Sequence, residues 1–247
     1  MDTYGSRSLV VGGVAIHKAT GKVIEKAKRI AAHLLEANED DVEFGSGKFT
    51  VKGSPEASLT IQEVALATFA AHNLPDGMEP TLDSDYVYDP ENFSYPHGTH
   101  LCAVEVDTET GRVTVIDSYV ADDCGKALNP TAVHGQTNGA TVQAIGWALY
   151  EQLHFEGGRL QNGNFADYTM PTADAVPMLR CGLVESNDPN GPYGAKGASE
   201  TAILPGAPAI ANAVFDAIGV RIRTLPITPE KVLAALRAQA QGDPHHA

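Results

Sequence analysis

The residues best placed to do chemistry lie in one short stretch, where glycines flank a lysine and a carboxylate follows. The stretch is Gly194-Ala-Lys-Gly-Ala-Ser-Glu200. Glycine lets another molecule approach the main chain closely, and successive N–H groups beside a helix start can bind an anion. Glu200 would then lie next to the bound group as a candidate general base. The alternative is a helix-entry loop whose Lys196 and Glu200 face water, and a short glycine-rich loop alone does not decide between the two.

Three further loops combine glycine with hydrogen-bonding side chains beside a helix or strand end. They are Thr3-Tyr-Gly-Ser-Arg-Ser8, Tyr95-Pro-His-Gly-Thr-His100 and residues 122–139, which include Asp123-Cys-Gly125 and Gly135-Gln136. Four such loops would suit a large, polar, phosphate-bearing cofactor that needs many donors. Each loop taken singly is better explained as a turn. The sequence contains no P-loop, no GxGxxG after a strand and no GxSxG.

His97 and His100 raise the question of a metal site, but no third ligand follows at suitable spacing, so we interpret both as structural. Cys102, Cys124 and Cys181 lie far apart without a CxxC pair. They therefore predict neither a disulfide framework nor a zinc or iron–sulfur ligand set. Cys124 has no evident histidine partner, which makes a nucleophilic mechanism a weak hypothesis. We expect no metal-ligating side chain.

Charge and length limit the function classes. The 247 residues carry 17 Lys and Arg against 31 Asp and Glu, a formal charge of −14, which repels nucleic acid and anionic membranes. No apolar run approaches the roughly 20 residues that cross a bilayer, and the first residues do not resemble a signal peptide. We expect a cytoplasmic protein that binds neither nucleic acid nor membrane.

The elements that must position these loops are predicted from periodicity and turn signals. Helical spacing covers residues 22–38, a Thr-x-x-Glu capping box opens a helix over 60–71, and further helices cover 131–153, 208–218 and the stretch after Pro229. Strands are predicted at 41–44 and 48–52, joined by Gly45-Ser-Gly47, and at 99–107 and 112–120, joined by 108–111. Residues 75–96 are expected to be irregular. The fold class is α+β, with helices and hairpins interspersed, and the small residues of 131–153 indicate close packing.

Taken in order, the four loops resemble the molybdopterin-binding large subunit of the molybdenum hydroxylases, namely xanthine dehydrogenase, aldehyde oxidase and aerobic carbon monoxide dehydrogenase. The sequences of these motifs are most similar to those of the bacterial carbon monoxide dehydrogenase-like branch. The resemblance runs from Thr3 to about Ala238 and corresponds to the C-terminal part of that subunit. It implies a molybdopterin-binding region over residues 1–240, with room for two subdomains, and a disordered tail over 241–247.

The resemblance also implies roles for individual residues. Glu200 would be the catalytic base beside the molybdenum, which the pterin rather than a protein side chain holds. The residues implied to bind the cofactor are Thr3, Tyr4, Ser6, Ser8, Asp123, Cys124, Gly125, Gln136, Lys196, Gly197 and Ser199. The chain departs from the pattern at Ser199, where the family commonly has glycine, and serine narrows the loop.

The implied function is a molybdopterin-dependent oxidoreductase component that hydroxylates an aldehyde or N-heterocycle or oxidises carbon monoxide. The cofactor would be molybdenum–molybdopterin in its cytosine dinucleotide form, with iron–sulfur clusters and FAD on partner subunits only. The partners would be the N-terminal half of the large subunit and the iron–sulfur and flavin subunits, so the isolated chain is expected to be inactive. Two alternatives stay open: a non-catalytic remnant or assembly subunit without cofactor, and a protein that binds a pyrophosphate ligand without redox chemistry. The substrate is not indicated by the sequence.

Overall fold

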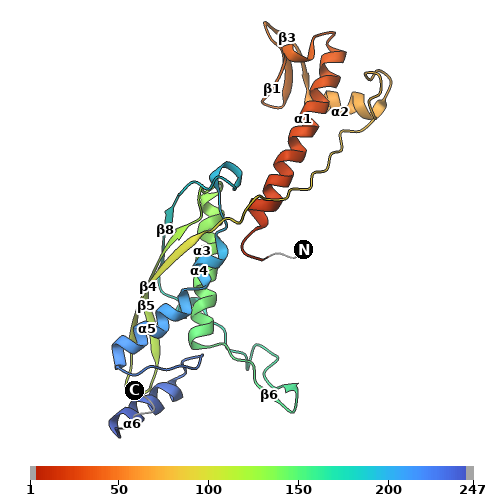
Figure 1. Ribbon diagram of the computed structural model, residues 1–247. Helices are drawn as coiled ribbons and strands as arrows, with labels where there is room; N and C mark the ends of the chain where they lie inside the picture. Colours follow the sequence, from red (N-terminus) through yellow and green to blue (C-terminus); the bar gives the residue numbers. More distant parts are fainter. Residues whose placement is uncertain (1–3, 243–247) are drawn as a thin grey trace. The chain divides into compact units, whose positions relative to one another are not determined.

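The computed structural model describes residues 4–242, and its elements are labelled in Figure 1. The helices are η1 (Ser8–Gly13), α1 (Val14–Leu34), η2 (Glu39–Asp41), α2 (Ile61–Ala70), α3 (Pro130–Leu149), η3 (Ala173–Ala175), η4 (Pro192–Gly194), α4 (Ser199–Ile203), α5 (Gly206–Ile218) and α6 (Pro229–Ala240). The strands are β1 (Val42–Gly45), β2 (Lys48–Val51), β3 (Ser54–Thr60), β4 (His97–Val106), β5 (Val113–Asp123), β6 (Phe155–Glu156), β7 (Arg159–Leu160) and β8 (Leu179–Val184). The mixture of helices and small sheets confirms the predicted α+β class.

The chain divides into two compact units, which are described separately. The small unit is Val11–Pro90. The large unit is Glu91–Ala247 together with Met1–Val10. The turn at residues 4–8, here called the N-terminal turn, therefore belongs to the large unit. The predicted tail begins beyond α6, and its residues 243–247 lie outside the described part, as does Thr3.

The small unit packs α1 and α2 against the antiparallel sheet β1-β2-β3. Its core includes Ile30, Phe49 and Val64, all fully buried. The predicted hairpin is confirmed, with Gly45 paired to Lys48 across the turn. The capping box is also confirmed: the Thr60 hydroxyl accepts the Glu63 N–H at 3.2 Å, and the Glu63 carboxylate accepts the Thr60 N–H at 2.7 Å.

Two predictions for the small unit were incomplete. Helix α1 begins at Val14 instead of Lys22. The earlier start was not predicted because the first two turns make few core contacts and so lack an apolar stripe; Ile16, for example, is exposed. The helix ends at Leu34, since Glu36 adopts a left-handed backbone conformation with φ of 52°. Strand β3 was not predicted, because its Pro55 and its exposed first half hide the strand pattern.

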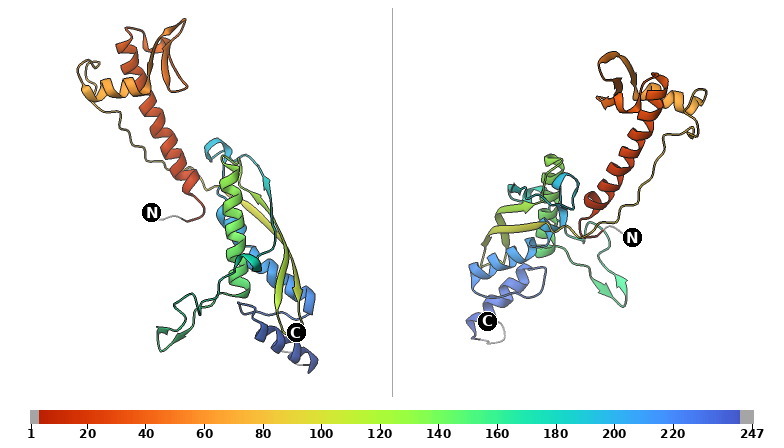
Figure 2. Two further views of the ribbon diagram at one scale, coloured as in Figure 1. Left: turned by 180° about the vertical axis from the view of Figure 1, so that it is seen from behind. Right: turned by 45° about the horizontal axis from the view of Figure 1, so that its top comes forward.

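The large unit is built on the hairpin β4–β5. Its predicted turn is confirmed, with Gly111 at φ of 78°. Helix α5 packs on β4, and α3 lies beside α5 (Figure 2). The core draws residues from the hairpin, from α3 and α5 and from α6, among them Val115, Ile145, Ile210, Val214 and Val232.

Strand β8 completes this sheet and was not predicted. It pairs with β5 in parallel, with Asp122 opposite Leu183 and Asp123 opposite Val184. Parallel strands end at the same edge of a sheet, so the loops that follow β5 and β8 emerge side by side. These two loops position much of the candidate site.

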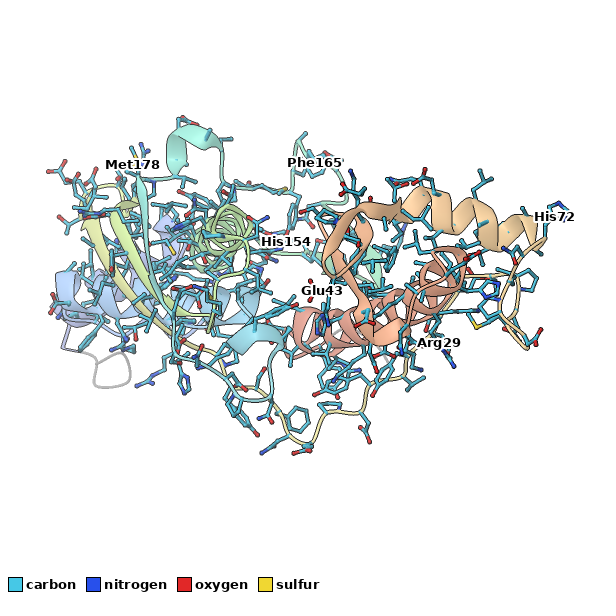
Figure 3. All side chains as sticks on the ribbon, turned by 90° about the horizontal axis from the view of Figure 1, so that it is seen from above. Arg29, Glu43, His72, His154, Phe165 and Met178 are labelled. Atoms are coloured by element: carbon cyan, nitrogen blue, oxygen red, sulfur yellow. The ribbon has the colours of Figure 1, made fainter. Side chains whose placement is uncertain are left out.

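Helix α3 ends at Leu149, four residues before its predicted end, and the chain leaves the sheet as an arm, here defined as residues 151–172. The short hairpin β6–β7, joined by Gly157 and Gly158 with positive φ, stands clear of the sheet in Figures 1 and 2. Phe165, labelled in Figure 3, is 86% exposed on this arm. This hairpin was missed because each strand is only two residues long.

The glycines of α3 fulfil the packing prediction only in part. A Cβ on Gly146 would meet the end of the flexible Glu151 side chain and lie 3.2 Å from Pro171, so this glycine packs closely against both. Gly135 and Gly139 face open space. Close packing therefore explains the C-terminal half of α3 alone.

The stretch Ser199–Ile218, which contains α4 and α5, is long and apolar enough to cross a membrane by length and composition alone. The expectation that no such run exists was therefore wrong. The apolar residues Ile210, Val214 and Ile218 are buried in the core of the large unit. Core packing accounts for these three apolar residues of α5.

Candidate functional site

A cavity of about 500 Å³ in the large unit lies where several loops meet. Residues from the N-terminal turn, the loop after β5, the first two turns of α3 and the stretch 196–200 line it. The lining residues are Tyr4, Ser6, Ser8, Leu9, Cys124, Lys126, Leu128, Asn129, Ala132, Val133, Gln136, Lys196, Gly197, Ala198, Ser199 and Glu200. Segments almost two hundred positions apart in the sequence thus share one site.

The cavity brings together most of the residues predicted for the site. The nine that line it are Tyr4, Ser6, Ser8, Cys124, Gln136, Lys196, Gly197, Ser199 and Glu200. Asp123 and Gly125 are not among its lining residues, while Thr3 falls outside the described residues. Sequence reasoning missed several lining residues, of which Lys126 and Asn129 are polar, although both belong to the loop that was singled out.

Glu200 is exposed at the start of α4 and contacts the N-terminal turn. The Ser6 hydroxyl lies 3.4 Å from Glu200 Oε2 and accepts the Glu200 N–H at 3.2 Å. Gly197 makes this approach possible, because a Cβ there would overlap Ser6 Cβ and lie 2.7 Å from the Ser6 carbonyl oxygen. The turn itself is ordered by the Arg7 guanidinium over the Tyr4 ring at 4.8 Å.

The main-chain donors at the beginning of the stretch 194–200 are used within the chain. The N–H groups of Gly194 and Ala195 donate to the carbonyls of Gly191 and Pro192, and the Lys196 N–H donates to Cys124 at 2.7 Å. These donors are consumed within the chain, so they are not available to a ligand. The glycines instead allow two loops to touch.

Lys196 is buried, with 9% of its side chain exposed, and its ammonium contacts the chain's own acceptors. It donates to Asp123 Oδ2 at 2.8 Å and to the Ser186 hydroxyl at 2.7 Å. Burial of Asp123 opposes its ionisation, but hydrogen bonds from Lys196, from the Ser186 hydroxyl and from two backbone N–H groups hold the pKa of Asp123 well below its usual range. Asp123 is therefore ionised, and Lys196 neutralises it.

Asp122 precedes Asp123 and is fully buried. Its carboxylate accepts the Thr201 hydroxyl at 2.6 Å and the Thr137 hydroxyl at 3.0 Å. Burial raises the pKa of Asp122, although the two hydroxyls oppose this shift. Asp122 thus joins β5 to α3 and to the residue that follows Glu200.

Ser199 and Gln136 meet at the cavity wall. The Ser199 hydroxyl donates to Gln136 Oε1 at 3.2 Å. Gln136 lies on α3, whose start is fixed by Pro130 at the first turn and by the Asn129 side chain, which accepts the Ala132 N–H at 3.0 Å. The serine that departs from the family pattern therefore has a partner in the same cavity.

Burial affects both Cys124 and His100. Burial raises the pKa of the Cys124 thiol, which disfavours the reactive thiolate. His100 packs against Gly206 outside the cavity, and burial lowers its pKa. Within residues 4–242, no three His, Cys, Asp or Glu side chains gather as potential metal ligands.

The lining suits a pterin cofactor of the kind that the motif resemblance implies. Hydroxyls of Tyr4, Ser6 and Ser8 and the amides of Asn129 and Gln136 can both donate and accept hydrogen bonds. Apolar side chains such as Leu9, Leu128 and Val133 provide a surface for a ring system. A few polar groups placed among apolar ones are typical of cofactor sites, so the residues present fit a pterin cofactor.

Comparison with known proteins gives a consistent family. Residues 1–177 match the model of a molybdopterin cofactor-binding domain. The chain is 37% identical over 241 residues to the carbon monoxide dehydrogenase large chain of Hydrogenophaga pseudoflava, covering 96% of this chain and 30% of the relative. It is 39% identical over 236 residues to the 6-hydroxypseudooxynicotine dehydrogenase complex subunit gamma of Paenarthrobacter nicotinovorans, covering 94% and 30%.

Solved structures agree with these relatives. Quinoline 2-oxidoreductase from Pseudomonas putida 86 superposes with a TM-score of 0.80 at 35% identity, covering 95% of this chain and 30% of that chain. Reconstituted carbon monoxide dehydrogenase from Oligotropha carboxidovorans gives a TM-score of 0.80 at 33% identity, with 97% and 30% covered. The chain thus spans about 30% of the length of the relatives it matches.

Proposed function

Because this chain belongs to the family of molybdopterin cofactor-binding domains, we propose that its cavity is one wall of a molybdenum hydroxylase active site and that Glu200 is the base there. The observation that carries the proposal is the convergence of three of the four family-like loops on one cavity, which Glu200 also lines. The wider reaction class is hydroxylation of an aldehyde or N-heterocycle or oxidation of carbon monoxide. The relatives' names support this range, since they include a carbon monoxide dehydrogenase and a quinoline oxidoreductase.

When bound, the molybdenum centre supplies the redox chemistry of such a reaction. The chain's own residues supply proton handling and orientation. Ser6 lies against Glu200 Oε2, which leaves Oε1 to accept a proton from the reacting group. A positioned carboxylate base accelerates such steps by roughly 10²–10⁴-fold.

The cavity hydroxyls and amides would orient the pterin and its dinucleotide. Tyr4, Ser6 and Ser8 present hydroxyls from the N-terminal turn, and Gln136 presents its amide from α3. Thr3 belongs to the proposal through the resemblance alone. The cytosine dinucleotide form is also part of the proposal, on the same ground.

Glu200 is exposed in this chain, whereas a base of this kind works in a site that excludes water. We therefore assign the opposite wall to polypeptide that corresponds to the rest of the relatives' length. Iron–sulfur and flavin subunits would complete the electron path, and the relative named as subunit gamma of a complex supports an assembly of several chains. A cytoplasmic location is part of this proposal.

The test is Glu200→Gln in the assembled enzyme, formed with partner polypeptides that supply the remaining wall and redox centres. We expect turnover of aldehydes, N-heterocycles or carbon monoxide to fall about 10²-fold or more, while molybdenum content stays unchanged. Glu105→Gln, which changes an exposed carboxylate on β4, is the matched control and should keep full turnover. Unchanged turnover in Glu200→Gln would refute the assigned role.

Metal and pterin analysis of the same wild-type complex distinguishes the proposed function from a non-catalytic role. A non-catalytic subunit that only binds a partner would carry neither molybdenum nor pterin. That result would overturn the proposed function irrespective of the Glu200 variant.

A further inference from the structure

We propose that the consecutive carboxylates Asp122 and Asp123 at the end of β5 hold the Glu200 segment at two points. Asp123 acts through Lys196 and Ser186, and Asp122 acts through Thr201. Lys196 is then a positioning residue rather than a cofactor contact through its ammonium. The segment's importance for catalysis rests on the proposed function, but the anchoring itself does not.

The first anchor is a closed set of three side chains. Lys196 Nζ donates to Asp123 Oδ2 at 2.8 Å and to Ser186 Oγ at 2.7 Å, and Ser186 Oγ donates to the same Asp123 oxygen at 2.5 Å. The second Asp123 oxygen accepts the N–H groups of Ser186 at 3.2 Å and Gly125 at 3.0 Å. Every polar group of Asp123 is thus used inside the protein.

Burial distinguishes the Lys196–Asp123 ion pair from the nearby Lys126–Glu185 pair. The Lys196 and Asp123 side chains are 9% and 14% exposed. The Lys126 and Glu185 side chains, whose charged atoms lie 3.6 Å apart, are 53% and 43% exposed. Water and salt screen an exposed pair much more than a buried one. Removal of one buried partner leaves the other charge uncompensated. If Lys196 turned toward a ligand, the buried charge of Asp123 would be left without its partner.

Main-chain contacts join the same two loops. The Lys196 N–H donates to Cys124 at 2.7 Å, the Lys126 N–H donates to Gly194 at 2.9 Å, and Gly125 forms a bridge with Ala195. A Cβ on Gly125 would overlap the Gly194 carbonyl oxygen and lie 2.9 Å from the Lys196 nitrogen. The loops are therefore in direct contact where the side-chain anchor sits.

The second anchor lies on the other side of Glu200. Thr201 donates to Asp122 at 2.6 Å, and Gly98 on β4 lies against the Thr201 carbonyl, since a Cβ there would overlap that oxygen. Successive strand side chains point to opposite faces. Two adjacent residues of β5 can therefore reach Lys196 and Thr201 separately, with Glu200 between them.

The inference is tested by hydrogen exchange on the full chain without cofactor. In Ser186→Ala and in Lys196→Met, we expect the amides of residues 194–201 to exchange about tenfold faster, with α6 unchanged. Ser186→Thr, which restores the hydroxyl, should restore protection. Lys126→Met, which removes the neighbouring exposed cation, should leave exchange unchanged. The anchor would be refuted by unaltered exchange in both test variants, or by equal acceleration in α6, which would indicate a purely global effect.

Lysine acylation gives a second measurement that needs no folded Lys196 variant. In the wild-type chain, Lys196 should react with an amine-directed reagent about tenfold more slowly than Lys126, since burial and the bonds to Asp123 and Ser186 shield its amine from the reagent. Ser186→Ala keeps both charges and should speed the reaction of Lys196. Equal rates for the two lysines in the wild type would overturn the proposal. Neither measurement uses turnover, so the anchor and the role of Glu200 can fail independently.

Discussion

Replacing Thr201 by valine should destabilise the large unit through the buried carboxylate of Asp122. The change keeps the side-chain shape but removes the hydroxyl that donates to Asp122 at 2.6 Å. Asp122 is fully buried, and a buried acceptor left without its partner costs about 1–3 kcal/mol. For a unit of this size, that cost lowers the unfolding midpoint by about 2–12 °C.

The assay is urea unfolding followed by tryptophan emission. Trp147 is the only tryptophan in the sequence and lies on α3, the helix whose Thr137 also bonds Asp122, so its emission reports the large unit. Thr131→Val, at an exposed position in the first turn of α3, is the matched control and should change the free energy of unfolding by less than about 0.5 kcal/mol.

The stability cost of these substitutions should also change with pH, in a direction set by the pKa of Asp122. Burial raises the pKa of Asp122 in the folded state, so its favourable contribution is complete below the unfolded pKa, near 3.9, and is lost as the pH rises through the folded value. Asp122→Asn carries no charge, so its cost relative to wild type should shrink as the pH rises above about 4. The Thr201 hydroxyl lowers the pKa of Asp122, so the cost of Thr201→Val should grow over the same range. A Thr201→Val cost under about 0.5 kcal/mol, or slopes of the same sign in the two variants, would refute this reasoning.

Two further substitutions test the turn at Ser6 and the cap of α2. Gly197→Ala places a Cβ against Ser6, so we expect both Ser6–Glu200 contacts to be lost at a cost of about 1–3 kcal/mol. Faster exchange of the Glu200 amide would report this, with Gly135→Ala, at an open glycine, as the control; an unchanged amide would contradict it. Thr60→Ala removes the N-cap hydroxyl and should cost about 0.5–2 kcal/mol in the small unit. Hydrogen exchange of α2 amides measures it, and protection equal to wild type would show that the capping box does not stabilise the helix.

Local signals made part of the fold predictable. Gly111 at a tight turn predicted the β4–β5 hairpin, and the Thr60–Glu63 spacing predicted the start of α2. Each depends on residues within a few positions of one another. Strand β8 depends instead on pairing Leu179–Val184 with β5 about sixty positions earlier, and a six-residue strand carries no local mark of its parallel partner.

The sequence predicted which residues belong to the site better than it predicted how they are arranged. The order of four motifs predicted the family, which is confirmed, and nine of the predicted residues line one cavity. The role of Ser186 was missed, because a serine after an unpredicted strand has no signal of its own. Lys196 between two glycines reads the same whether its ammonium faces a ligand or an aspartate 73 positions earlier, and only the fold decides.

Ser199 shows how a departure from the family pattern can change the chemistry that the wall presents. A glutamine amide has one accepting oxygen and two donor hydrogens, so an unconstrained Gln136 could turn either end toward a ligand. The Ser199 hydroxyl donates to Gln136 Oε1, which engages the oxygen and leaves the NH₂ group to face another partner. Glycine at position 199 could not make this bond. The serine therefore gives the Gln136 oxygen a partner within the cavity wall and leaves the NH₂ group available to a group bound in the cavity.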